Sequence, residues 1–60
     1  MTVSFEYKVL DGEDPVFEQY TDIKQCSYYF AYDRIYLKLY KNNYDFCIDM
    51  SDIKSFLIES

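Results

Sequence analysis

The residue types that usually carry out acid–base or nucleophilic chemistry are scarce in this chain. None of its 60 residues is a histidine, so no imidazole is present to act as a base near neutral pH. Arrangements of Ser, His and Asp or of Cys and His are therefore excluded. Carboxylates are plentiful, but a catalytic pair of acids needs a substrate groove, and a domain of this size has little room for one. We expect a protein without enzymatic activity.

Two groups of side chains have the chemistry of metal ligands. Asp45, Cys47 and Asp49 would share one face of a strand, and three acids crowd residues 11–14. Zinc sites ordinarily use more Cys or His ligands, and residues 11–14 lack the ligand spacing of a calcium-binding loop. We interpret both groups as solvated acids, and Cys26 and Cys47 as reduced, small, buried apolar residues rather than a disulfide. No metal and no cofactor is expected.

Basic and aromatic residues alternate in one segment, Arg34, Tyr36, Lys38 and Tyr40. On one face of a strand, this pattern can stack the bases and neutralise the phosphates of single-stranded nucleic acid. Only six residues of the whole chain are basic, however, which disfavours that function. We rank pairing of Lys and Tyr across neighbouring strands first, a subunit interface second and nucleic-acid binding third.

Acidic residues outnumber basic ones by eleven to six, which gives the chain a net charge of −5. Such a protein suits a basic partner, because complementary charge accelerates encounter. Carboxylates spread over a rigid β scaffold can also imitate a phosphate backbone; the alternative is that they only keep the domain soluble. The acids predicted to contact a partner are Asp11, Glu13, Asp14, Asp45 and Asp49.

Aromatic residues are more numerous than a small core requires, with eight Tyr and five Phe. Tyrosine is apolar in its ring and polar at its tip, and it is enriched at the energetic centres of protein interfaces. The predicted contact residues are tyrosines on polar faces or at turns, Tyr29, Tyr36, Tyr40 and Tyr44. Because large apolar side chains occupy both faces of several expected strands, we also predict a symmetric homodimer that covers them.

Alternation of apolar and polar residues predicts an all-β fold in a single domain, residues 1–60. We expect a small antiparallel sheet of five or six strands, or such a sheet curled into a barrel, which would cover its edges. The predicted strands lie near residues 2–10, 15–20, 25–32, 34–41, 44–50 and 55–59. An α+β alternative has a short helix near 14–24, because Asp14 and Pro15 resemble a helix start. The predicted core residues are Phe5, Phe30, Leu37, Phe46 and Ile48.

A possible internal repeat relates the two halves of the chain. When position 21 is aligned with position 51, the sequence Thr-Asp-Ile-Lys at 21–24 falls on Ser-Asp-Ile-Lys at 51–54. Each half would be a hairpin, a short turn and a third strand, either by duplication or because both halves follow the same strand physics. In each turn we expect the isoleucine, Ile23 or Ile53, to enter the core while Asp22 or Asp52 bonds a nearby backbone N–H.

In size, charge and composition, the chain resembles the small acidic inhibitors of host defence that phages and mobile elements encode, anti-CRISPR proteins especially. The resemblance implies a non-enzymatic inhibitor that binds a basic host protein, such as a CRISPR nuclease, and can block its access to nucleic acid. A cytoplasmic location in a bacterial host is expected, because the N-terminus lacks signal-peptide features and no apolar run is long enough to cross a bilayer. The alternatives are a small homodimerising interaction module or a single-stranded nucleic-acid binder.

Overall fold

The computed structural model describes all 60 residues and consists almost entirely of β-strands. The elements are β1 (Thr2–Tyr7), β2 (Val16–Tyr20), β3 (Gln25–Ala31), β4 (Arg34–Tyr40), β5 (Asp45–Asp49), the 3₁₀ turn η1 (Met50–Asp52) and β6 (Ile53–Glu59). The all-β prediction is therefore confirmed, and the helix alternative for 14–24 is wrong because that segment forms β2 and a turn. No helix of the structure is long and apolar enough to cross a membrane.

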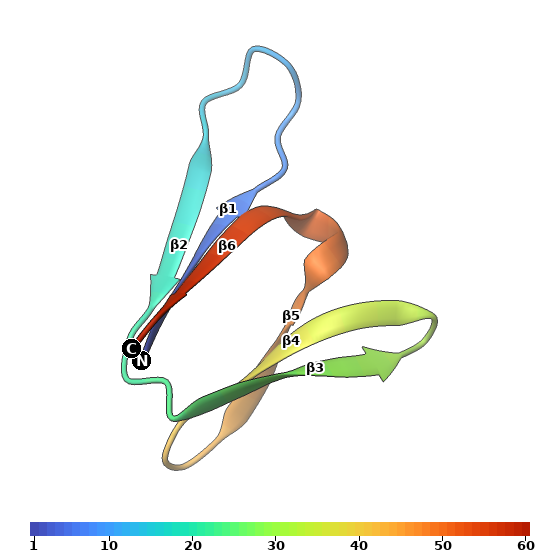
Figure 1. Ribbon diagram of the computed structural model, residues 1–60. Coiled ribbons are helices and arrows are strands. Elements are labelled where there is room, and N and C mark those ends of the chain that lie inside the picture. Colours follow the sequence, from blue (N-terminus) through green and yellow to red (C-terminus); the bar gives the residue numbers. More distant parts are fainter.

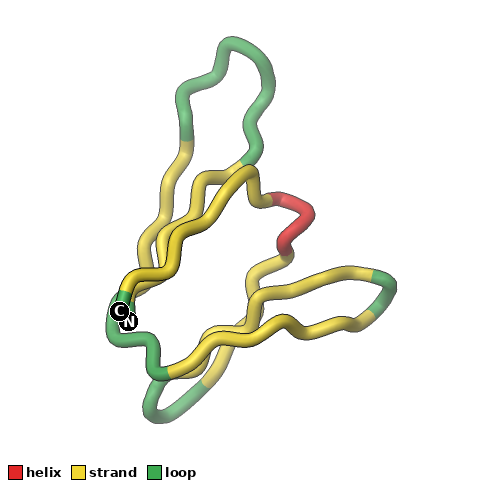
Figure 2. The backbone as a smooth tube through the Cα atoms, in the orientation of Figure 1, coloured by secondary structure: helices red, strands yellow, loops and turns green.

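The six strands form two antiparallel three-stranded sheets. The β1 sheet has the order β2-β1-β6, and the β4 sheet has the order β3-β4-β5. Figure 1 shows the sheets meeting near the two chain ends and diverging toward the β3–β4 turn, and Figure 2 shows the loops that join them. The structure thus differs from the single curled sheet expected from sequence, because the chain passes from one sheet to the other at residues 21–24 and at η1.

The two halves of the chain exchange their third strands. Each half begins with a hairpin, β1–β2 or β4–β5, but β3 pairs with β4 and β6 pairs with β1. If β1, β2 and β6 are replaced by β4, β5 and β3, the order β2-β1-β6 becomes β5-β4-β3, which is the order of the other sheet. Val3 of β1 pairs with Ile58 of β6, and Leu37 of β4 pairs with Tyr28 of β3. The equivalent residues Tyr28 and Ile58 are therefore as far apart in sequence as the repeated turns at 21–24 and 51–54. Equivalent residues of the central strands β1 and β4 are further apart in sequence than those of β3 and β6, because the β1–β2 loop is longer than the β4–β5 loop.

The core lies between the two sheets and is small. Its buried residues are Val3, Phe5, Ile23, Leu37, Leu39 and Ile53, with Phe46 and Ile48 packed at its margin. The predictions for Phe5, Leu37 and the two turn isoleucines are confirmed. The prediction for Phe30 is wrong, since 70% of its surface is exposed. The β3–β4 hairpin extends beyond the opposite sheet, so nothing covers the inner face of its distal end (Figure 1).

Candidate functional site

The β1–β2 hairpin projects from the rest of the molecule as an arm, which we define as residues 8–19 (Figure 1). Its loop is held by local bonds: the Glu13 N–H donates to the Leu10 carbonyl (3.1 Å), and the Leu10 N–H donates to Glu13 Oε1 (3.0 Å). Gly12 adopts φ +85°, a left-handed conformation that favours glycine. At the base of the arm, the Lys8 N–H donates to the Asp52 carbonyl (2.9 Å), which ties the loop to η1.

Every residue of the arm is exposed, and most of its side chains are acidic or apolar. The arm has four acids, Asp11, Glu13, Asp14 and Glu18, and one base, Lys8. None of these five takes part in the two ion pairs of the structure. Four exposed apolar side chains lie among them, Val9, Leu10, Val16 and Phe17. The arm therefore combines uncompensated negative charge with apolar surface that the protein's own core does not use.

A carboxylate and two phenols connect the arm to the core. The hydroxyls of Tyr7 (2.7 Å) and Tyr20 both donate to Glu18 Oε1. These bonds, from Tyr20 first, hold the pKa of Glu18 below its ordinary value, while burial and the bond to Glu18 raise the pKa of Tyr20. The Tyr20 ring also packs edge-on against buried Phe5, with centroids 5.9 Å apart. Glu18 thus stays ionised and its side chain is fixed relative to the core.

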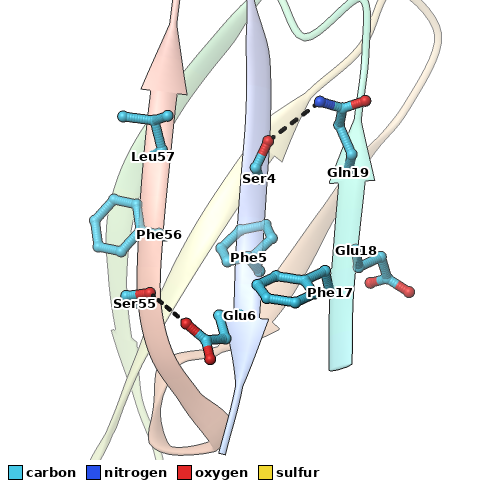
Figure 3. Close-up of a pocket in the computed structure, with 9 residues that line it drawn as sticks. All are labelled: Ser4, Phe5, Glu6, Phe17, Glu18, Gln19, Ser55, Phe56 and Leu57. Carbon is cyan, nitrogen blue, oxygen red and sulfur yellow. Dashed lines mark hydrogen bonds between the residues drawn. The ribbon is translucent and has the colours of Figure 1, made fainter. Parts of the chain in front are cut away.

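A shallow groove of about 450 Å³ crosses the outer face of the β1 sheet beside the arm. Figure 3 shows its residues on three strands, with Ser4 of β1 between Leu57 of β6 and Gln19 of β2. Gln19 Nε2 donates to Ser4 Oγ (3.3 Å), and Phe17 and Leu57 supply apolar surface on either side of β1. Phe17 belongs to both the groove and the arm, so the two form one continuous surface.

The outer face of the β4 sheet carries the alternating basic and aromatic residues. Lys38 Nζ lies 5.2 Å from the ring centroid of Tyr29 and 5.5 Å from that of Tyr40. Tyr29 and Tyr36 face each other across β3 and β4, with centroids 6.3 Å apart. These are cation–π and aromatic contacts between and along strands. The predicted pairing of Lys with Tyr across neighbouring strands is present between Lys38 and Tyr29.

The other cation of this face is held in an ion pair. Arg34 Nη1 lies 2.7 Å from Asp49 Oδ2. The Asp49 carboxylate also accepts bonds from the Ser51 N–H (3.0 Å) and Ser51 Oγ (2.8 Å), and these, with Arg34, lower its pKa. Asp49 therefore caps η1 and makes the bond to a turn N–H that was predicted for Asp52. Because the charges of Arg34 and Lys38 are already engaged, this face is less suited to phosphates than its sequence pattern indicates.

The predicted contact residues fall on two separate surfaces. The three acids of residues 11–14 belong to the arm, whereas Asp45 and Asp49 oppose Tyr40 and Tyr36 on the β4 sheet. Tyr44 is exposed in the β4–β5 loop, with its ring 6.0 Å from that of Phe46. The predicted contact residues do not include Leu10, Phe17 or Leu57. Alternation around Phe17 could have placed it on an outer face, but only the sheet order brings it to the same face as Leu57.

The two cysteines differ in environment. Cys26 is half-buried with its Sγ 3.9 Å from Met1 Sδ, while Cys47 is exposed on β5, so the prediction that both are buried is wrong for Cys47. The reason is the order of the sheet, because β5 is an edge strand and Cys47 lies on its outer face. Cys47 lies between Asp45 and Asp49, but no three acidic or thiol side chains of the structure are grouped so that they could hold a metal ion.

The fold and these surfaces are the only guides to the protein's relationships. Comparisons with protein-family models, with curated proteins and with solved structures gave no match.

Proposed function

We propose that the protein is a non-enzymatic inhibitor that binds a basic nucleic-acid-handling protein of a bacterial host through the arm. The observation that carries the proposal is the combination, on one projecting element, of uncompensated acids and exposed apolar side chains. A CRISPR nuclease is the kind of partner implied by the resemblance to phage and mobile-element inhibitors. Its nucleic-acid channel is basic and would attract the acids at the tip of the arm.

Charge and apolar contact have separate roles in this proposal. The acids accelerate encounter with a basic surface, and their effect falls as salt screens them. Leu10 and Phe17 provide the apolar contacts that hold the complex, since binding energy concentrates in desolvated, well-packed side chains. Local hydrogen bonds at Glu13 and Glu18 favour the bound shape of the arm before the partner arrives, which reduces the ordering cost of binding.

The alternative function, single-stranded nucleic-acid binding on the β4 sheet, has less support. Its two cations are engaged by Asp49 and by two tyrosine rings, and a phosphate would have to displace those contacts. The acids Asp45 and Asp49 lie on the same face and would repel it. The arrangement of charge favours a basic protein as the partner.

The test is inhibition of purified RNA-guided nucleases by charge variants of the arm. The variant Asp11→Lys with Asp14→Lys leaves Glu13 in place to hold the loop and changes the net charge from −5 to −1, because each reversal adds 2. We expect the native protein to bind at least one of the purified nucleases and to slow its cleavage of DNA. This inhibition should become weaker as the salt concentration rises. The arm variant should associate about tenfold more slowly.

A matched control separates local from net charge. Asp52→Lys with Glu59→Lys also brings the net charge to −1, but both residues lie outside the arm. This control should associate within about twofold of the native rate at moderate salt. If both pairs of reversals slow association equally, the arm is not the contact. If the native protein neither binds nor inhibits any of the purified nucleases, the proposed function is refuted.

A further inference from the structure

Four strands form the edges of the two sheets, and one of them, β3, has no feature that prevents pairing with another chain. Its seven residues, Gln25–Ala31, include no charged residue and no proline. It pairs with β4 in an unbroken register over its whole length. On its other side, alternate N–H and C=O groups have no strand to bond, as in any antiparallel edge strand.

The other three edge strands have the protection that β3 lacks. Strand β2 contains Glu18 and follows Pro15, and β5 begins and ends with an aspartate. Strand β6 contains Lys54 and Glu59, and its register with β1 shifts at Glu6 and Tyr7. Charges, prolines and bulges are the devices that keep sheet edges from associating. Strand β3 is therefore the edge that is most open to pairing with another strand.

An apolar surface adjoins this edge. The inner-face and turn residues of the β3–β4 hairpin that remain exposed are Tyr28, Phe30, Tyr32 and Ile35, with exposed fractions from 48% to 89%. At about 200 Å² for a fully exposed large side chain, they present on the order of 500 Å² of surface. A stable interface buries roughly 800 Å² on each partner. The surface beside β3 thus supplies more than half of the area that one side of a dimer requires.

We propose that two copies of the protein associate through antiparallel pairing of β3 with β3, forming a continuous six-stranded sheet. A strand that pairs with itself over its full length has its twofold axis at its midpoint, which in β3 is Tyr28. Tyr28 then faces Tyr28 of the second copy, and Cys26 faces Phe30 of the second copy on the inner side. Because β3 is uncharged, self-pairing opposes no like charges, whereas β5 would bring aspartates together.

This dimer does not depend on the proposed function. Strand β3 and the arm belong to different sheets, so loss of the dimer and loss of partner binding can be observed separately. The apolar residues at the β3 edge, which the small core leaves uncovered, become buried between the two copies.

Light scattering after size-exclusion chromatography tests the proposal at a protein concentration of about 100 μM, since association depends on concentration. The native chain should elute as a dimer, with twice the chain mass of 7.3 kDa. The variant Tyr28→Lys places two ammonium groups opposite each other and should give the monomer mass with an unchanged circular dichroism spectrum. Phe30→Lys should also give the monomer mass, and it replaces Tyr28→Lys as the test if that variant fails to fold. The control Phe17→Lys changes an equally exposed ring on another edge strand and should remain a dimer.

Disulfide trapping tests the register. In a Cys26→Ala, Cys47→Ser background, Tyr28→Cys should oxidise to a covalent dimer, because directly opposed residues lie within disulfide reach. Ser27→Cys, one residue off the axis, should not. Three results would overturn the proposal: a native protein of monomer mass, a folded Tyr28→Lys variant that stays dimeric, or a dimeric Tyr28→Cys variant that does not cross-link.

Discussion

Truncation of Leu39 to alanine should remove a large part of the folding stability. Leu39 has no exposed surface and is one of only six buried residues, so its loss leaves a cavity between the sheets. Buried Leu→Ala changes cost roughly 2–5 kcal/mol, and we expect about 3 kcal/mol here. A 60-residue domain has a total stability of roughly 3–9 kcal/mol. With a urea m-value of about 1 kcal/mol/M, the unfolding midpoint should fall by about 3 M.

The matched control is Leu57→Ala. Both leucines lie in strands, so their substitutions change strand propensity alike, but Leu57 is 57% exposed on the outer face of β6. Its truncation should cost about 1 kcal/mol or less. Both variants are unfolded in urea at one fixed protein concentration and followed by far-ultraviolet circular dichroism, because the proposed dimer would also contribute to stability. A Leu57→Ala loss equal to or larger than that of Leu39→Ala would refute this assignment of the core.

Three further outcomes are expected. Glu18→Ala should return the pKa of Tyr7 toward its ordinary 10.0, while burial keeps that of Tyr20 raised; the ultraviolet absorbance of tyrosinate measures both. Because the folded-state pKa of Glu18 is lowered, its contribution to stability is present above the unfolded value of about 4.3 and is lost as pH falls through the folded value. The urea midpoints of native protein and Glu18→Ala should therefore converge in acid; a constant gap would contradict this. Ile23→Ala and Ile53→Ala should each cost about 2–5 kcal/mol, and a negligible loss at either site would show that the two turns are not equivalent.

Local signals in the sequence were sufficient to predict the strands. The alternation around Leu37 and Leu39 and the turn residues between strands give all six elements nearly in their observed positions. The repeated Asp-Ile-Lys turns likewise indicated that Ile23 and Ile53 enter the core. These features depend on neighbouring residues, because alternation in a strand decides which side chains share a face and turn residues decide where the strand ends.

Only the tertiary structure decided which strand faces are covered by the opposite sheet. Phe30 lies on the same face of the β4 sheet as Leu37 and Leu39, as alternation predicts, yet it is exposed because the opposite sheet does not extend over it. The exchange of β3 and β6 between the two halves and the meeting of Phe17 with Leu57 on one face also depend on contacts between distant segments. Periodicity along the chain specifies the face of each side chain, but burial requires a second surface, and its position depends on how the sheets pack.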